Sequence, residues 1–331
     1  MEIGTPLKRL EIIGTDDTSI LKANHSTMLN KGSKEYILSV REEILKNRGF
    51  KIPEDWDTEW DANLGPIWTP AELGDAIVCW LSPEYLHPLS TDDDIVAQAD
   101  DRSGNGVVWE NTHASGTLPT FTSELNGFKG MSFANDWLYS LDESGDGELD
   151  PGTGGFAISM LISHGAIGTA ERYILCTDNS RDFALSVKEV SGVDRYKVYF
   201  NGSATESATT VDVSGDPFIL TVGRKSGNQF LKTSAVSIDD TAITGSQVID
   251  IDDSQQFFIG AREHVSSDRY AVAGFTGEIY EIIFYHGNLS TDDMEKIEGY
   301  LAHKYAQTAA LHTGSPAHPY KTNPPRAGVP A

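Results

Sequence analysis

Short apolar runs separated by turn residues dominate the chain from residue 74 onward. Several of them alternate apolar and polar positions, which is the period of a strand with one buried face. In the run RYKVYFNG, for example, Tyr196, Val198 and Phe200 point to one side, and Lys197 and Tyr199 to the other. We expect strands in the runs DAIVCWLS, FAISMLIS, YILCT, FALSVKEV, RYKVYFNG, PFILTVG, QFFIGA and GEIYEIIFY. Many short strands without intervening helices predict an all-β sandwich or barrel.

Two segments have the period of a helix instead. The first, at about residues 33–48, begins at a capping Ser33 and has an apolar stripe made of Ile37, Val40, Ile44 and Leu45. The second, at about residues 290–306, begins at Ser290 or Thr291 and has an apolar stripe made of Met294, Ile297, Leu301 and Tyr305. We expect the second helix to cover one open end or edge of the sandwich, with the tail segment HPYK fastening it.

These patterns divide the chain into three parts. Residues 1–73 form an N-terminal arm with the first helix and a linker rich in Trp and Pro, residues 74–310 form the sandwich with the second helix, and residues 311–331 form a tail that packs on the sandwich. Several exposed indoles would be unusual in a free linker, so we expect the Trp side chains of this linker to pack on a surface. The predicted partner-binding residues of the arm are Ile37, Val40, Ile44, Leu45, Trp56, Trp60 and Trp68.

Charge is distributed unevenly along the chain. The net charge is −24, but residues 1–53 carry +2 and the remainder carries −26. An acidic body repels nucleic acid, whose affinity for proteins comes mainly from phosphate neutralisation, so we expect no nucleic-acid partner. No apolar run is long enough to span a membrane, and the start of the sequence lacks the pattern of a secretory signal. We therefore expect the protein to be made in a cytoplasm and to have no membrane partner.

Several blocks between residues 74 and 325 resemble a known family. DDRSGNGVVWE, LNGFKGMSFANDWLYS, QQFFIGARE, the ending FTGEIYEIIFYHGNLSTDDMEKIEGYLAHKY and the tail SPAHPYKTNPP are similar to blocks of laminin-G-like, concanavalin A-like jelly-roll domains. The usual Trp before D-x-S-G-N-G is absent, and Gln98 and Ala99 stand in that region. The resemblance implies a concanavalin A-like (LamG-like) jelly-roll β-sandwich with a C-terminal capping helix, here preceded by an arm that contains one helix.

The same resemblance suggests where such a protein works. Domains of this type with this ending, and without a signal peptide, look like those of tailed-phage virions. This implies an exterior capsid decoration or head-fibre protein, which the arm attaches to other virion proteins at the virion surface after assembly in the host cytoplasm. Trimers suit the points of such a lattice. The alternative is a phage tail or adhesion protein whose lectin-like sandwich binds host glycans.

Catalytic chemistry is weakly supported. Glycanases of this broad fold class carry carboxylates that alternate along one strand. The nearest match, Asp55, Asp57 and Glu59, follows Pro53 in the linker, where a solvated acidic segment is the simpler interpretation. Glu278 and Glu281 are three residues apart, so we expect them on opposite faces of their strand. We also expect no catalytic role for the histidines of the last helix and tail, His303 and His318, and predict that the protein is not an enzyme.

Metal and ligand candidates remain. Asp142, Ser144 and Asp146 follow the oxygen-ligand pattern of a calcium loop, although Thr153 stands where such a loop has Glu. Calcium is therefore the one cofactor that the sequence suggests. The two Cys residues lie in apolar runs and are expected to be buried thiols, with their pairing open. Two Trp residues could stack on a sugar, but core packing is favoured for both. These Cys and Trp residues are Cys79, Cys176, Trp109 and Trp137.

Overall fold

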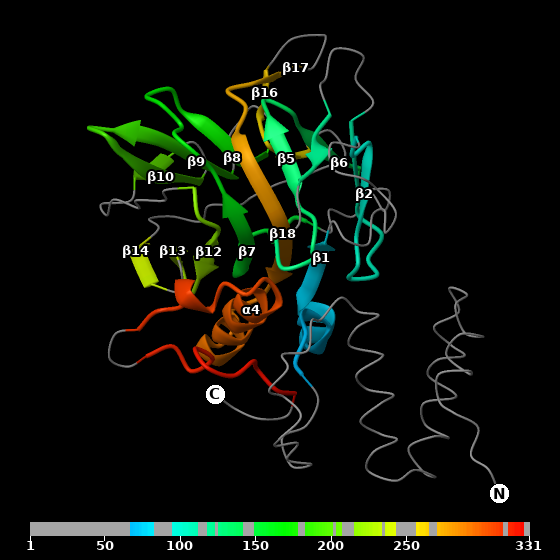
Figure 1. The fold of residues 1–331 in the computed structure, drawn as a ribbon, viewed down its shortest axis with the longest axis vertical. Coiled ribbons are helices and arrows are strands. Elements are labelled where there is room, and N and C mark those ends of the chain that lie inside the picture. The colour runs from blue at the N-terminus through cyan, green and yellow to red at the C-terminus, as the bar shows by residue number, and fades with distance from the viewer. Residues whose placement is uncertain are drawn as a thin grey trace, which may run out of the picture. The chain divides into compact units, whose positions relative to one another are not determined.

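Two antiparallel β-sheets packed face to face make up most of the described chain (Figure 1). The computed structural model describes residues 67–82, 95–111, 118–122, 125–141, 149–177, 183–200, 203–206, 215–233, 236–242, 256–264, 270–313 and 317–327. All of these residues fall in one compact unit, residues 62–331. The predicted arm helix, Trp56, Trp60, the carboxylates of residues 55–59 and the predicted calcium loop at residues 142–146 lie outside the described residues.

The first sheet has the strand order β14-β13-β12-β7-β18-β5-β4, and β1 also pairs with β18. Its strands are β1 (Ile77–Leu81), β4 (Thr120–Phe121), β5 (Met131–Ala134), β7 (Phe156–Ser163), β12 (Phe218–Lys225), β13 (Asn228–Thr233), β14 (Val236–Ala242) and β18 (Thr276–His286). Strand β5 pairs with the first half of β18 and β1 with its second half. These two short strands therefore follow each other along one edge of β18, while β7 covers the other edge.

The second sheet has the strand order β11-β10-β9-β8-β15-β6-β3-β2. Its strands are β2 (Gln98–Asp100), β3 (Val108–Glu110), β6 (Leu138–Leu141), β8 (Arg172–Thr177), β9 (Phe183–Val190), β10 (Val193–Phe200), β11 (Ser203–Glu206) and β15 (Phe257–Ile259). A separate two-stranded ladder joins β16 (Arg262–His264) to β17 (Tyr270–Val272). The chain passes repeatedly from one sheet to the other, so neighbouring strands are often distant in sequence.

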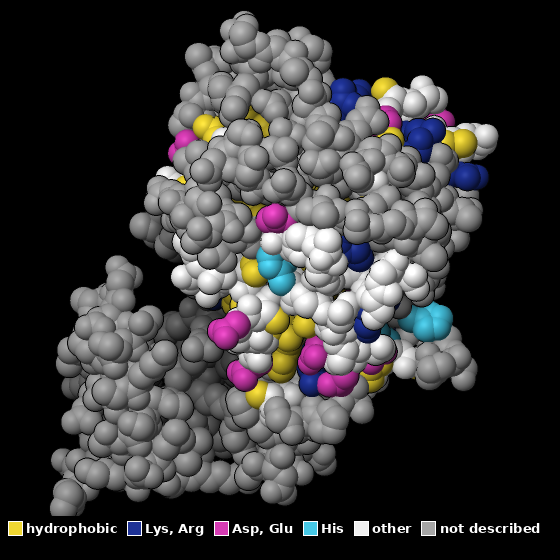
Figure 2. Space-filling view, turned by 180° about the vertical axis from the view of Figure 1, so that it is seen from behind, with side chains coloured by type: hydrophobic (Ala, Val, Ile, Leu, Met, Phe, Trp, Pro, Cys, Tyr) yellow, Lys and Arg dark blue, Asp and Glu magenta, His cyan; other side chains and the backbone are white. Residues whose placement is uncertain are grey.

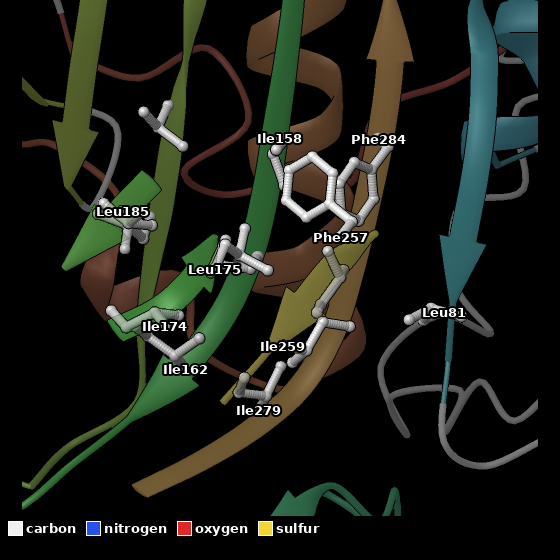
Figure 3. Close-up of a cluster of buried hydrophobic side chains, with 14 of the residues drawn as sticks. Leu81, Ile158, Ile162, Ile174, Leu175, Leu185, Phe257, Ile259, Ile279 and Phe284 are labelled. Atoms are coloured by element: carbon white, nitrogen blue, oxygen red, sulfur yellow. The ribbon is translucent and has the colours of Figure 1, made fainter. Parts of the chain in front are cut away.

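The core lies between the two sheets and takes alternate residues from most of their strands (Figure 3). Residues that the close-up labels in this layer include Ile158, Leu175, Leu185, Phe257 and Phe284. In β10, the three residues predicted to share a face all enter this core, while Tyr199 joins a separate cluster on the opposite face. The expected all-β sandwich is therefore confirmed, together with the strand alternation that predicted it.

Strand β18 contains a β-bulge that corrects one prediction. Its register with β7 shifts between Ile279 and Glu281. Because the bulge adds one residue, the alternation of faces is reset, and Glu278 and Glu281 both point away from the core. The Glu278 carboxylate accepts a hydrogen bond of 3.0 Å from Ser163 on that outer side. The expectation that the two carboxylates lie on opposite faces was therefore wrong.

The C-terminal helix α4 (Thr291–Lys304) covers the outer face of the first sheet. It begins as predicted, because the Ser290 side chain accepts a hydrogen bond of 3.0 Å from the Asp293 backbone N–H. The outer face beneath it carries apolar residues that need cover, Leu161, Ile219 and Ile283. The helix therefore covers the face of a sheet, not an open end of the sandwich. A short 3₁₀ turn, η5 (Thr308–Ala310), follows it.

The first described residues belong to the sandwich unit. Ile67 pairs with Arg326 of the tail, and the Trp68 backbone N–H donates to the Pro325 carbonyl at 2.9 Å. The 3₁₀ helix η3 (Pro70–Ala76) then leads into β1. Residues 67–73, which the sequence assigned to the arm, thus include residues that contact the tail of the sandwich unit.

Candidate functional site

A buried ion pair lies between the first sheet and α4. Lys304 Nζ is 2.6 Å from Glu281 Oε2, and the two side chains are 1% and 0% exposed. The other Glu281 oxygen accepts hydrogen bonds from Trp80 Nε1 at 2.5 Å and the Tyr300 hydroxyl at 3.0 Å. The Tyr305 hydroxyl donates to Oε2 at 2.9 Å. We call these five residues the Glu281 centre.

The Glu281 centre joins three segments that are distant in sequence. Trp80 comes from β1, Glu281 from β18, and the other three residues from the helix and its C-cap. Burying a charge is unfavourable unless it is paired and hydrogen-bonded, and here the carboxylate has a cation and three neutral donors. The centre therefore fastens the helix to the sheet. Because both charged side chains are enclosed, it offers no surface to a ligand.

The tail is held on α4 by the segment that was predicted to fasten it. His318 Nε2 is 3.3 Å from Glu298 Oε2, and the other oxygen of that carboxylate accepts from Lys232 Nζ at 2.6 Å. Lys321 Nζ donates to the carbonyls of Thr308, Ala309 and Leu311. His318 thus has an acid partner that lies 20 residues earlier in the chain, and the pair serves to hold the tail.

The D-x-S-G-N-G segment of the sequence stabilises the free edge of β1. Asp101 Oδ1 accepts from the Trp80 backbone N–H at 2.7 Å. Asn105 Nδ2 donates to the carbonyls of Ile77 and Val78, both at 3.0 Å. Side chains of this loop thus take the place of a neighbouring strand, and an edge strand needs such cover. Gly104 and Gly106 have φ values of 96° and 82°, a conformation that glycine adopts most easily.

A buried histidine links the two sheets. His164 follows β7, and its Nε2 is 2.5 Å from the Tyr196 hydroxyl of β10. Its Nδ1 is 2.9 Å from the Gly165 carbonyl and 3.7 Å from Asp194 Oδ2. Burial lowers the pKa of His164 below its ordinary value, although the neighbouring carbonyl and Asp194 oppose this shift. Burial also raises the pKa of Tyr196 well above its usual range. The neutral imidazole is therefore the form that suits this position.

Polar and aromatic groups meet on the outer face of the second sheet, around the partly exposed Glu171. One oxygen of the Glu171 carboxylate accepts from the Ser186 hydroxyl of β9 and from the Tyr199 hydroxyl of β10, both at 2.6 Å. The Tyr199 ring stacks on Tyr173 with a centroid distance of 6.3 Å, and the Arg262 guanidinium lies 5.2 Å from the Tyr173 ring centroid. Ser186, Tyr173 and Tyr199 are buried, and Glu171 and Arg262 are the partly exposed members. Among the described residues this is the best candidate for ligand contact, because a carboxylate and a guanidinium reach the surface there.

The other predicted site residues lie elsewhere. Trp68 is 4% exposed and packs edge-to-face on Tyr300, with a ring-centroid distance of 6.5 Å. This indole therefore has almost no surface left for a partner. Trp109 is fully buried in the core, and Trp137 is buried in an outer-face cluster with Tyr139 and Phe258. Neither indole has a face open to a sugar, in agreement with the favoured packing role.

Both cysteines are buried free thiols. Burial raises the pKa of Cys79 well above its ordinary value. Within the described ranges, no group of three or more His, Cys, Asp or Glu side chains is placed to hold a metal ion. A cavity beside Leu149, Phe156 and Phe257 measures only about 10 Å³, which is room for about one water molecule. In the same part of the chain, no helix is long and apolar enough to cross a membrane.

The sequence matches no protein-family model and no curated protein. Among solved structures it is similar to a botulinum neurotoxin type C structure, whose description says that cell entry depends on interaction with two ganglioside molecules. The identity is 14% and the TM-score 0.48, and the match covers 70% of this chain and 53% of that one. The binding domain of botulinum neurotoxin DC in complex with SialylT matches at 11% identity and a TM-score of 0.44, with coverages of 69% and 52%.

A third similar structure is domain 4 of AbnA, a GH43 extracellular arabinanase from Geobacillus stearothermophilus, in complex with arabinotriose. It matches at 12% identity and a TM-score of 0.39, and covers 60% of this chain and 96% of that one. The chain spans about half the length of the two neurotoxin structures. These likenesses are distant, and the sandwich assignment is based on the strand pairings described above.

Sequence reasoning missed both Glu171 and Glu281 as centres of polar contact. Glu281 stands in an apolar run, and a charged residue at such a position is a signal for a buried partner. Nothing near Glu171 in sequence marks it. Its partners come from two later strands, and only the pairing of β8, β9 and β10 brings them together.

Proposed function

We propose that this chain is a non-enzymatic structural protein of a tailed-phage virion, most simply an exterior capsid decoration or head-fibre protein. In this proposal the N-terminal arm attaches each copy, as a monomer or homotrimer, to other capsid or tail proteins at the virion surface. The laminin-G-like sandwich is then held outward. The resemblance of the sequence blocks to domains of such virions supports this assignment.

The observation that carries the proposal is the place where the arm joins the sandwich. Ile67 and Trp68 are tied to Pro325 and Arg326, so the segment before residue 67 enters the unit beside the tail. An anchor at one such place leaves the rest of an acidic sandwich free to face water. The contrast between +2 for residues 1–53 and −26 for the remainder supports the same division of roles.

The way the sandwich is closed also suits a structural role. The buried charges of the Glu281 centre and of Glu298 join the helix and tail to the sheet, which is the use expected of groups that stabilise a scaffold. A stable attachment needs about 800 Å² of buried surface on each partner, and an arm of some 70 residues can supply that area.

Imaging of phage particles from cells that express the full chain, or the chain without residues 1–66, tests the proposal. We expect density for the protein on the particle exterior, and loss of that density when the arm is absent. A sharper pair of variants uses the predicted arm helix. Val40→Asp with Ile44→Asp should abolish incorporation, and Glu35→Gln on the same segment should not. Undiminished incorporation without the arm would show that the anchor lies elsewhere.

The second candidate function is adhesion, with the sandwich binding host surface glycans. Glu171 and Arg262 favour it, because both are partly exposed and a carboxylate and a guanidinium are groups that can hydrogen-bond to sugar hydroxyls. A glycan array probed with the full chain separates this function from a purely structural one.

A further inference from the structure

The segment that leads into the sandwich and the tail that follows it contact each other directly. We call residues 67–76 the entry segment and residues 317–327 the docked tail. The Trp68 backbone N–H donates to the Pro325 carbonyl at 2.9 Å, and the adjacent residues Ile67 and Arg326 form a β-bridge. In Figure 1 the red tail ends beside the blue entry segment, and Figure 2 shows the opposite side of the molecule. The two segments therefore hold each other, although they stand near opposite ends of the described chain.

Neighbouring residues of α4 support both segments. Trp68 of the entry segment is 4% exposed, and its ring packs edge-to-face on Tyr300. Tyr320 of the docked tail lies against Gly299, because a Cβ at that glycine would be only 2.6 Å from Tyr320 Cβ. The entry segment, the docked tail and one turn of α4 thus form a closed set of contacts, and each segment contributes to the position of the other.

Side chains on both sides of Tyr320 fasten the docked tail to α4. His318 Nδ1 accepts from the Tyr320 backbone N–H at 3.2 Å, so the proton of its neutral ring is on Nε2, which is 3.3 Å from Glu298 Oε2. His303 Nε2 of α4 is 2.8 Å from the Tyr320 carbonyl, to which it donates. Lys321 Nζ donates to three backbone carbonyls just beyond α4. The tail is therefore held at its start by α4 and near its end by the entry segment.

We infer that the entry segment and the docked tail open and close together, as one unit that we call the entry clasp. When the tail leaves α4, the Trp68 N–H loses the Pro325 carbonyl as its acceptor. When the entry segment leaves, the tail loses its backbone contacts to Ile67 and Trp68. Segments that depend on each other in this way open as one cooperative unit, separately from the core strands.

The entry clasp couples the arm to the tail. This consequence rests on the proposed attachment through the arm, whereas the clasp itself does not. A partner that binds the arm more tightly when the entry segment is closed also favours the docked tail. By linkage, the docked tail then strengthens the binding of that partner by the same factor. Loss of the tail should thus weaken the attachment of a chain whose arm is intact.

Hydrogen exchange of the full chain, read by mass spectrometry on peptides from the entry segment and the docked tail, tests the clasp. Trp68→Ala should raise exchange in the docked tail about tenfold or more, because it removes a buried side chain from the set of contacts. His318→Ala should raise exchange in the entry segment at least about threefold, the effect of one lost hydrogen bond. In each variant the two segments should change by the same factor, and amides of β7 should not change. Glu72→Gln is the matched control, because this exposed side chain lies in the entry segment, and both segments should keep their original rates.

Two results would overturn the proposal. One is a variant that changes one segment and leaves the other at its original rate. The second is an equal rise at the β7 amides, which would show that only the whole sandwich opens. If His318→Ala does not fold, Lys321→Met removes the three carbonyl contacts at nearly the same side-chain length and should give the same parallel rise.

The coupling to the arm is tested on phage particles. If the chain attaches to them, its docked tail should exchange more slowly there than in solution, and an unchanged rate would refute the coupling. If the chain does not attach, the virion proposal fails, and exchange in the free chain still decides whether the clasp exists.

Discussion

Replacing Lys304 with Met should be one of the most damaging single changes in the sandwich. The substitution keeps the length of the side chain but leaves the Glu281 carboxylate buried without its cation. Removing one partner of a buried ion pair typically lowers the free energy of unfolding by about 3–5 kcal/mol. Both side chains are 1% exposed or less, so solvent cannot replace the lost partner. We therefore expect a loss of about that size.

A double-mutant cycle with Glu281→Leu separates the charge from the hydrogen bonds. In the Glu281→Leu variant, Lys304 loses its carboxylate, and the Trp80 indole and the Tyr300 hydroxyl lose an acceptor. Each unsatisfied buried donor costs about 1–3 kcal/mol. The double variant buries no charge. Its loss of stability comes only from the two donors left without an acceptor and amounts to about 2–6 kcal/mol. Its loss should therefore be smaller than the sum of the two single losses.

Urea unfolding followed by tryptophan fluorescence provides the measurement, with the midpoint and the m-value determined for each variant. Lys296→Met is the matched control, because it makes the same change on the same helix. Lys296 pairs with Asp292, whose side chain is 34% exposed, so its loss should cost no more than about 1 kcal/mol. If Lys304→Met is no more costly than Lys296→Met, the idea that a buried ion pair fastens the helix is refuted.

Further predictions concern the tail, the inter-sheet histidine and the edge of β1. Gly299→Ala should loosen the tail and lower stability by about 1–3 kcal/mol, because a Cβ there would lie 2.6 Å from Tyr320 Cβ; faster proteolysis of the tail would reveal it. The pKa of His164 is lower in the folded chain than in the unfolded one, so its contribution to stability is present above about pH 6.5 and is lost as pH falls through the folded pKa. Unfolding midpoints across pH 5–8 should show this slope, His164→Phe should reduce it, and an unchanged slope would exclude the role. Asp101→Ala should cost about 1–3 kcal/mol by leaving the Trp80 backbone N–H without its acceptor, and an unaltered thermal midpoint would contradict that role.

Much of the fold could be predicted because its strands are strongly patterned. The runs predicted as β7 and β9 agree with the observed strands at both ends, and the last helix is capped by Ser290, one of the two predicted starts. These features depend only on residues that are close in sequence. The strands follow from the alternation of side chains, and the helix start follows from a hydroxyl next to free backbone N–H groups. The bulge in β18 was not predicted, because its insertion of one residue is set by the pairing with β7.

The groups around Glu171 show the opposite case. Glu171, Ser186 and Tyr199 belong to three different segments, and Lys188 meets Arg195 only because β9 and β10 pair in one register. A shift of one residue would move every one of these side chains to the other face. Composition showed an acidic chain, but not that one hairpin sorts its bases and acids onto opposite sides.

The sequence by itself determined the class of fold, the start of the terminal helix to within one residue and the uneven distribution of charge along the chain. All three are local or additive properties, which periodicity, capping and charge counts express directly. Only the tertiary structure decided that the helix covers the face of a sheet, that Lys304 reaches Glu281, and that Ser186 and Tyr199 donate to Glu171. Those contacts join residues from 15 to more than 200 positions apart, and strand order and register, which are properties of the whole chain, bring them together.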